Sequence, residues 1–375
     1  MPRLTDPTES RYAMTGALMA ESGDWVTPRV IRDGVAVEYW GKPPFHFWLT
    51  AAAIRVLGRT TVAARLPAFL MALLACWFTW RLGRRWWGAP AGAAAALMLA
   101  TSGLFIVGAG ASMTDMTLTA CLAGAMSHLT LALETADAGL RRRAGMVAAV
   151  LLALGFLTKG PVALALAVLP TGGWLALTGL WRRARRLPWG RGVLAFVLVA
   201  APWFILAERA TPGFMRYFFI NENLLRFFSH EYGDRYGAGH SHAPGLIWPV
   251  LVLCILPWSI PLAVRGWSLS RGPGLRRTLR TDPRLLFVAC WGLAPAVLFT
   301  VARQWLPAYL LPGIPGLALV TVRLGACPGS RRRLVIAGAM AVVMLAAALL
   351  LPSFLPDRSG PGRPVPDSVR YYRSP

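Results

Sequence analysis

Residues 38–58 read EYWGKPPFHFWLTAAAIRVLG, and this stretch decides how the chain is threaded through a membrane. Its apolar part, 43–58, is shorter than the roughly 20 residues that a helix needs to cross a bilayer. Apolar side chains nevertheless recur in it at helical spacing, interrupted by His46 and Arg55. The pattern predicts an amphipathic helix lying in the membrane interface. The KPP sequence forms a rigid entry to this helix, because prolines are tolerated in a first helical turn.

Long apolar runs dominate the rest of the chain. Of its 375 residues, 56% are hydrophobic and 15% are charged, and the mean hydropathy is +0.51. A soluble domain of this size does not need so much apolar surface, whereas membrane-spanning helices do. The sequence therefore predicts an all-α polytopic membrane protein with about ten spans. The runs lie at 62–82, 90–108, 116–133, 144–158, 161–180, 191–207, 244–264, 284–302, 306–322 and 332–352.

Basic residues fall in alternate loops between these runs. Five segments together carry 21 Arg and Lys against three acids: 81–89, 134–143, 181–191, 265–284 and 323–333. By the positive-inside rule these five segments are cytoplasmic, and the other segments face outward. A span at 43–58 would reverse every later loop, so the charge pattern supports the interfacial helix. The same rule accounts for the net charge of +23 without a nucleic-acid partner.

The charge pattern divides the chain into three parts. Residues 1–61 form an outward-facing loop with interfacial helices, and 62–352 form the transmembrane bundle. The bundle includes the outward loop 208–243, whose stretch PGFMRYFFINENLLRFF carries apolar side chains at helical intervals and predicts a second interfacial helix. Residues 353–375 form an outward tail rich in Pro and Arg. Unusual polar residues collect on the outer side in this arrangement, which indicates a site there.

The stretch TDPTESRYA, residues 5–13, admits two interpretations. Asp6 as N-cap, Pro7 in the first helical position and Glu9 two residues later form a capping arrangement for a helix that starts at residue 7. Alternatively, the acids Asp6 and Glu9 beside Arg11 combine a general base with an anion clamp. The residues alone leave both interpretations open.

Asp115 and the only two lysines, Lys42 and Lys159, are further candidates. Asp115 stands where an apolar run begins, so it or Thr114 could cap a helix, while an ionisable group at membrane depth also suggests function. Each lysine directly precedes Pro or Gly-Pro, where helix N-termini and free N–H groups gather. A cation beside helix N-termini makes a good phosphate site, and the alternative is an anchor that reaches to the membrane surface.

Candidates at the outer ends of later runs are weaker. GAGHSHAP places His240 and His242 two residues apart, and a metal would need at least one more ligand. ARQWLPAYLLP places Arg303 and Tyr309 at the outer end of a run, where Tyr309 could instead be part of an aromatic belt.

Eight stretches occur in an order that resembles one known family. They are DPTESRYA, SGDWVTPR, YWGKPPFHFW, TDMTLT, LGFLTKGPVAL, PGFMRYFFINENLLRF, LPWS and LPAYLLP. The family is that of the membrane glycosyltransferases that use polyprenyl-phosphate sugars, and the chain is most similar to the bacterial 4-amino-4-deoxy-L-arabinose (lipid A) transferases. Protein O-mannosyltransferases are more distant relatives. The resemblance covers about residues 4–325.

The resemblance implies a GT-C fold with an active site at the outer face of the bacterial cytoplasmic membrane. It implies a polyprenyl-phosphate-linked sugar as donor and a glycolipid such as lipid A, or a protein, as acceptor. By position, Arg11 and Lys42 match ligands of the donor phosphate, and Arg303 is a further cation there. Tyr39, Asp115 and Tyr309 match residues of the donor cavity. A histidine near 240 matches a metal or substrate site, so a divalent metal is a candidate cofactor.

The sequence departs from the family pattern at three places. The usual Asp of the first motif is Thr8, so the base would have to be Glu9 or Asp6, with Asp115 as a further candidate. The usual acid before KPP is Gly41, which makes a bound metal less expected. The family also has a span before the first motif, so the resemblance implies that the chain is truncated or its start misassigned.

The implied donor determines which charges the transfer reaction must stabilise. Displacement at the anomeric carbon builds negative charge on the departing lipid phosphate, so fixed cations there would stabilise the transition state more than the ground state. A hydroxyl acceptor needs a carboxylate base, whereas a phosphate acceptor is already ionised. A transporter and a non-catalytic subunit of a cell-envelope assembly are the alternatives from other classes. A transporter would be expected to show internal repeats, and none is evident in the sequence.

Overall fold

The computed structural model describes residues 4, 6–228, 242–243, 245–271, 278–279, 281–302 and 304–325. These residues are mostly helical, with a single two-stranded hairpin among them. The predicted fold class, an all-α polytopic membrane protein, is confirmed. The expected run at 332–352 lies outside the described residues, as does the tail at 353–375.

Five helices of the described part are long and apolar enough to cross a membrane. They are α3 (Thr61–Trp87), α6 (Thr114–Glu134), α8 (Pro161–Thr178), α10 (Trp189–Ala210) and α16 (Pro283–Thr300). Two bent pairs bring the number to seven if each pair is one span. The pairs are α4 (Ala89–Ala100) with α5 (Gly103–Ala109), bent by 71°, and α13 (Ile247–Cys254) with α14 (Ser259–Ser270), bent by 113°.

Two other predicted runs are helical but do not meet the same criterion of length and composition. Helix α7 (Ala138–Lys159) is 22 residues long, yet its first turns contain Arg141, Arg142 and Arg143. The run at 306–322 is broken into the 3₁₀ helix η2 (Pro307–Gly313) and α17 (Ile314–Arg323). Prolines cause the break, because each one lacks the N–H that a continuous helix requires.

The N-terminal part contains α1 (Pro7–Ser22), the strands β1 (Arg29–Arg32) and β2 (Val35–Glu38), and α2 (Phe45–Leu57). The strands pair antiparallel, and the turn between them has positive φ at both Asp33 and Gly34. Such a turn suits a two-residue hairpin, for which Asp-Gly is a favoured sequence. This hairpin is not among the elements expected from the sequence.

Helix α2 confirms the helix expected within 43–58 and is too short to span a bilayer at 13 residues. It packs against α1, and its Trp48 indole donates to the Trp25 carbonyl at 2.7 Å. Its position at the membrane interface stays a prediction. The predicted second outward helix is also helical, as α11 (Phe214–Arg216), the π-helix η1 (Tyr217–Leu225) and α12 (Arg226–Phe228).

Gly160 separates α7 from α8 and lies where η1 closely approaches the end of α7. Its φ is +69°, and a Cβ there would lie 2.5 Å from the Phe218 ring. Only glycine combines this backbone conformation with so close an approach. The Phe218 ring in turn belongs to an aromatic cluster with Phe204 and Phe214 that holds η1 against α10. The end of α7 is therefore held next to η1.

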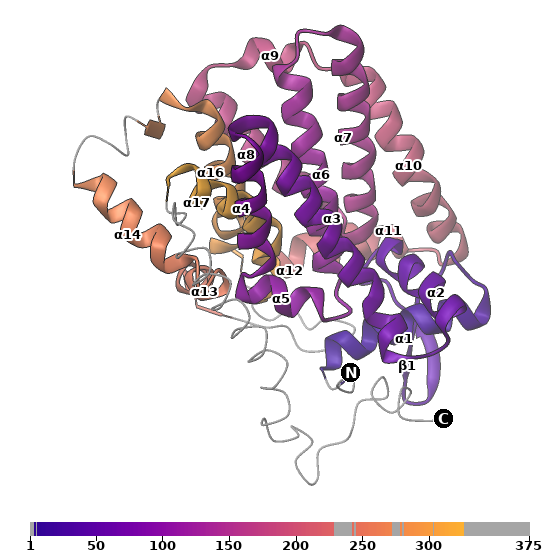
Figure 1. Cartoon of the computed structure of the whole chain (residues 1–375). Coiled ribbons are helices and arrows are strands. Elements are labelled where there is room, and N and C mark those ends of the chain that lie inside the picture. The colour runs from indigo at the N-terminus through magenta and orange to yellow at the C-terminus, as the bar shows by residue number, and fades with distance from the viewer. Residues whose placement is uncertain are drawn as a thin grey trace.

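The bundle has two chemically different ends (Figure 1). The short helix α9 (Trp181–Arg185) and the arginines near the ends of α3 and α17 mark one end, here called the arginine-rich end. Helices α1 and α2, the hairpin and α11 lie at the opposite end in Figure 1. The beginning of α6 and the end of α7 reach the second end, where polar side chains gather.

Candidate functional site

A small cavity of about 60 Å³ opens at the end of the bundle that carries α1 and α2. Its charged lining residues come from four separate segments: Lys42 before α2, Lys159 at the end of α7, Glu222 in η1 and Arg226 at the start of α12. The remaining lining residues are Val162, Asn223, Phe227, Phe299, Gln304 and Tyr309. Three cations thus face one carboxylate in this lining, so the cavity favours an anion.

Lys42 is held in the cavity wall by two hydrogen bonds. Its Nζ donates to Glu222 Oε1 at 2.6 Å and to the Gly41 carbonyl at 2.7 Å, and only 9% of the residue is exposed. Burial lowers the pKa of Lys42, but the Glu222 carboxylate and, less strongly, Tyr12 raise it. The resulting pKa lies above the usual lysine value. Lys42 is therefore a fixed positive charge at neutral pH.

Glu222 is shared between two cations and still has bonding capacity. Besides Lys42, it accepts from Arg226 Nη1 at 2.6 Å, one helical turn further along the chain. Both contacts use Oε1, while Oε2 is buried and has no hydrogen-bond partner in the described part of the chain. A buried carboxylate oxygen without a partner is costly. The arrangement is suited to exchange, in which an incoming anion takes over the two cations.

Lys159 forms the second buried ion pair beside the cavity. Its Nζ lies 2.5 Å from Asp115 Oδ1 and 3.7 Å from the centre of the Tyr309 ring. Helix α6 begins at Thr114 and has no side-chain cap, so the interpretation of Thr114 or Asp115 as a helix cap is wrong. The Asp115 carboxylate is instead committed to Lys159. This pair joins α6, α7 and η2 at the cavity.

His46 of α2 connects the cavity wall to α6. Its Nδ1 lies 2.9 Å from Thr117 Oγ1 and its Nε2 lies 3.4 Å from Ser112 Oγ, and the residue is fully buried. Burial lowers the pKa of His46 to about 4, although Asp115 opposes this shift. The imidazole is therefore neutral at pH 7. It fixes α2, and with it Lys42, relative to the start of α6.

His46 gives the first testable prediction. Its pKa is about 4 in the folded protein, against a reference value of 6.5. The unfolded chain therefore binds more protons between these values, and stability is lost as the pH falls through this window. At pH 4.5 we expect about 2–3 kcal/mol less stability from this group than at pH 7.5. Thermal unfolding of the wild type and His46→Asn at both pH values measures the difference.

The control is internal to that comparison, because carboxylates titrate equally in the two proteins. His46→Asn should lose less stability on acidification than the wild type does. Equal losses in both proteins would show that His46 is not buried in its neutral form.

Asp6 and Glu9 have structural partners outside the cavity. Asp6 caps α1, accepting from the Thr8 and Glu9 N–H groups at 2.8 and 2.9 Å, which confirms the capping interpretation for this residue. Both carboxylate oxygens of Glu9 are held by Arg65 of α3, at 2.7 and 2.9 Å, and the Ser112 N–H adds a bond of 3.0 Å. Neither acid lines the cavity. The Glu9–Arg65 pair ties α1 to the bundle.

Glu9→Gln tests this structural role. The change leaves the buried Arg65 guanidinium without its carboxylate, and breaking a buried pair costs about 3–5 kcal/mol. We expect a loss of that order in the free energy of unfolding, measured by denaturant titration in detergent. Glu21→Gln is the control, since Glu21 pairs with Arg59 at 3.6 Å on the surface and should cost below about 1 kcal/mol. Wild-type stability in Glu9→Gln would contradict the role.

The other predicted site residues are placed as follows. Tyr309 lines the cavity, whereas Tyr39 does not. Tyr39 is buried against Gly41, where a Cβ would lie 2.8 Å from the Tyr39 ring. This close approach gives a physical reason for glycine at position 41. Arg11 is half-buried on α1. His242 packs on Trp305, with ring centres 4.5 Å apart.

Arg303 and His240 lie outside the described residues. Within the described ranges, no group of three His, Cys, Asp or Glu side chains could hold a metal ion. A divalent metal therefore stays a prediction.

Sequence reasoning missed three functional candidates: Arg226, His46 and Gln304. Arg226 and Glu222 stand four residues apart, a spacing typical of a helical ion pair. That spacing is a usable local signal, although the apolar spacing of the same stretch predicts an interfacial helix. No local signal connects Glu222 with Lys42, because 180 residues separate them.

Comparison with known proteins finds relatives of this chain in sequence and in structure. Residues 41–205 match the family model described as dolichyl-phosphate-mannose-protein mannosyltransferase. An undecaprenyl phosphate-alpha-4-amino-4-deoxy-L-arabinose arabinosyl transferase of Pseudomonas aeruginosa is 32% identical over 325 residues, which are 84% of this chain and 54% of that protein. A relative of the same description from Proteus mirabilis is 27% identical over 86% of this chain and 55% of its own length. The chain thus spans about half the length of the curated relatives it matches.

A solved structure shares the fold. The crystal structure of ArnT from Cupriavidus metallidurans bound to undecaprenyl phosphate superposes with a TM-score of 0.78 and 29% identity. The match covers 99% of this chain and 64% of that one. The same protein in the apo state gives a TM-score of 0.77. On fold, sequence and motif order together, the chain belongs to the family of GT-C membrane glycosyltransferases that use polyprenyl-phosphate sugars.

Proposed function

We propose that this protein transfers a sugar, 4-amino-4-deoxy-L-arabinose, from undecaprenyl phosphate to a lipid A-like glycolipid. The observation that carries the proposal is the buried cavity in which Lys42, Lys159 and Arg226 face a single lining carboxylate. A phosphate monoester linked to a sugar carries the charge that this surplus of cations would bind. The relatives named above supply the sugar and its lipid carrier.

The donor phosphate would replace Glu222 on the two cations that now share it. Lys42 Nζ and Arg226 Nη1 both bond Glu222 Oε1 at 2.6 Å, so they converge on one point. A phosphate oxygen at that point would accept from both. Arginine adds a planar fork suited to phosphate, and lysine adds a compact charge. When no donor is bound, Glu222 pairs with Lys42 and Arg226, so these buried cations are not left without a counter-charge.

In the transfer step, the bond between the anomeric carbon and the phosphate oxygen breaks, and its electron pair stays on the phosphate. The acceptor oxygen forms the new bond to the anomeric carbon. Negative charge grows on the phosphate as the bond breaks, and the fixed cations stabilise that charge without reorganising. A phosphate acceptor needs no base, whereas a hydroxyl acceptor passes its proton to a carboxylate.

Asp115 is the carboxylate we assign to that position. It is buried beside the cavity and is held by Lys159, whose Nζ lines the same space. Asp6 and Glu9 were the other candidate bases, and their engagement in the α1 cap and the Arg65 pair favours structural roles. Arg11 and Arg303 are assigned to further contacts with the donor phosphate, and Tyr39 and Tyr309 to the donor cavity. His240 and His242 are assigned to a metal or substrate site.

We place this multi-pass protein in the bacterial cytoplasmic membrane with the cavity facing outward. The arginine-rich loops would then face the cytoplasm, as the positive-inside rule requires. Residues 1–61 and 208–243 would lie on the outer side, with 62–352 as the bundle and 353–375 as an outer tail. A lipid-linked donor suits that side.

Transfer itself is the test of the proposed function. The purified full chain in lipid nanodiscs is incubated with undecaprenyl-phosphate aminoarabinose and lipid A, and modified lipid A is measured by mass spectrometry. We expect the mass of one added aminoarabinose. Unchanged lipid A, with the donor intact and the protein folded, would contradict the proposal.

Arg226→Gln tests the phosphate assignment. Glu222 keeps Lys42 as partner in this variant, so the fold should be retained. Losing a charge-assisted contact of about 1.5–3 kcal/mol should weaken donor binding by roughly 10- to 100-fold, seen as a higher KM for the donor. Arg216→Gln in the same loop is the control, because Arg216 is exposed and does not line the cavity. Equal KM values in the two variants would exclude Arg226 from the phosphate site.

A further inference from the structure

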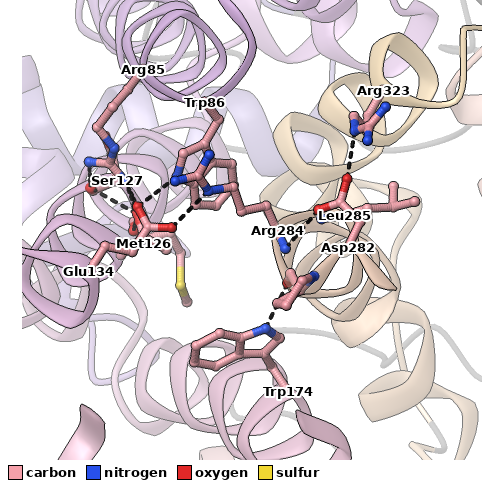
Figure 2. Close-up of polar contacts among 12 residues, drawn as sticks. Arg85, Trp86, Met126, Ser127, Glu134, Trp174, Asp282, Arg284, Leu285 and Arg323 are labelled. Carbon is pink, nitrogen blue, oxygen red and sulfur yellow. Dashed lines mark hydrogen bonds and ion pairs between the residues drawn. The ribbon is translucent and has the colours of Figure 1, made fainter. Parts of the chain in front are cut away.

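A second cavity, of about 390 Å³, lies at the arginine-rich end of the bundle, opposite the proposed active site. Its wall is built from the ends of the five helices α3, α6, α8, α9 and α16. Figure 2 shows most of the polar contacts in this region. The volume is within the range of cavities that hold small molecules or lipid headgroups. Nothing in the proposed transfer reaction uses this cavity.

The two acids of the lining are already neutralised by the protein. Glu134 accepts from Arg284 Nε at 3.0 Å and from the Trp86 indole at 2.8 Å, and Arg85 lies 3.7 Å away (Figure 2). Asp282 caps α16 with one carboxylate oxygen and binds Arg323 Nε at 2.6 Å with the other. Neither Glu134 nor Asp282 is therefore left to attract a cation from solution.

Positive charge remains after these pairs are formed. Arg183 of α9 lines the cavity, and in the part of the chain that the structure describes no ion pair or side-chain hydrogen bond engages its guanidinium. Arg284 bonds Glu134 through Nε, and about half of its side chain is exposed. The cavity thus presents guanidinium groups to an anion at its rim. Guanidinium groups are suited to phosphate because of their planar fork.

The inner wall of the same cavity is aromatic. Trp86 and Trp174 each meet the edge or face of Phe287, with ring centres 6.2 and 5.6 Å apart. The Trp174 indole is held by the Pro283 carbonyl at 2.7 Å, so this wall is fixed. An apolar wall behind a cationic rim matches an amphipathic anion, with its charge outside and its hydrocarbon part inside.

The surroundings place the cavity at the depth of lipid headgroups. Trp181 and Trp189, on either side of the α9 arginines, are 50% and 60% exposed. Tryptophan side chains enriched at the end of a bundle mark the boundary between hydrocarbon and water, and arginines beside them attract anionic lipids. An anionic lipid in the membrane leaflet at this end of the bundle is consequently the anion that can reach the cavity.

We propose that this cavity binds the phosphate headgroup of an anionic phospholipid from the leaflet at the arginine-rich end. Arg183 and Arg284 hold the phosphate, and the Trp86–Phe287–Trp174 wall holds the first part of an acyl chain. The bound lipid ties together α3, α6, α8, α9 and α16, whose ends form the cavity. This site is separate from the donor cavity, so its occupancy does not depend on the proposed transfer reaction.

Native mass spectrometry of the full chain, with added phosphatidylglycerol or phosphatidylcholine of matched chains, tests the proposal. The wild type should retain phosphatidylglycerol more strongly than phosphatidylcholine. Arg183→Gln should weaken phosphatidylglycerol binding roughly ten-fold, as expected for the loss of one charge-assisted contact. Arg182→Gln is the matched control, because Arg182 is also exposed on α9 and does not line the cavity.

Two results would overturn the proposal. Equal phosphatidylglycerol affinity in Arg183→Gln and Arg182→Gln would show that the cavity is not the lipid site. Displacement of the lipid by excess inorganic phosphate would assign the cavity to a free phosphate from solution instead. Arg183→Gln is an exposed substitution, so the protein should fold in every arm, and thermal unfolding verifies this.

Discussion

Lys42→Ala should reduce sugar transfer by about three orders of magnitude while the protein stays folded. Lys42 is one of two cations that converge on Glu222 Oε1, the point assigned to the donor phosphate. Its positive charge is secured by the carboxylate, which raises its pKa against the effect of burial. Removing it withdraws a fixed charge from the oxygen on which negative charge develops. The loss should therefore appear in kcat as well as in donor binding.

The fold should survive Lys42→Ala because Glu222 retains Arg226 at 2.6 Å. Thermal unfolding of the variant verifies this before transfer is measured. Arg55→Ala is the matched control, since Arg55 is a cation on the exposed side of α2 and contacts the Ala20 carbonyl rather than the cavity. Near-wild-type transfer by folded Lys42→Ala would remove Lys42 from the mechanism.

Asp115→Asn should damage both stability and transfer. The buried Lys159 ammonium contacts the Asp115 carboxylate and the Tyr309 ring, and the change removes the negative charge of the first of these partners. Breaking one side of a buried pair costs about 3–5 kcal/mol. If Asp115 is also the base, transfer to a hydroxyl acceptor should fall by about 10²- to 10⁴-fold. The free energy of unfolding and the transfer rate are measured on the same preparation.

The double variant Asp115→Asn/Lys159→Met separates the two effects. It removes the uncompensated charge together with the carboxylate, so much of the lost stability should return. Transfer should stay low, because the carboxylate and one cation of the cavity are both missing. Recovery of transfer along with stability would assign the Asp115–Lys159 pair to packing alone.

Local features of the fold could be predicted from the sequence. The cap of α1 by Asp6 depends on neighbouring residues, and so does the helical spacing that places α2 at Phe45–Leu57. The hairpin was missed although Asp33-Gly34 is a recognisable turn signal between two apolar stretches. The proline-rich run at 306–322 is not one continuous helix, because its prolines divide it into η2 and a short α17.

The composition of the site could be predicted only in part. Lys42, Asp115, Lys159 and Tyr309 were recognised as unusual residues, and the structure brings them together around one space. Their partners depend on packing between distant segments, which no local pattern encodes. The pairing of Glu9 with Arg65 rather than with nearby Arg11 is such a case, because it requires α1 to lie on α3.

The most direct test of the account is the binding of undecaprenyl phosphate to the purified full chain, measured by native mass spectrometry. The wild type should bind one molecule that survives activation. Lys42→Ala/Arg226→Gln, compared only after thermal unfolding verifies that it folds without either partner of Glu222, should bind it at least about 100-fold more weakly, given two lost charge-assisted contacts. Arg55→Ala/Arg216→Gln removes the same number of charges outside the cavity and should bind it like the wild type. Equal binding by both double variants would contradict the claim that this cavity holds the donor phosphate.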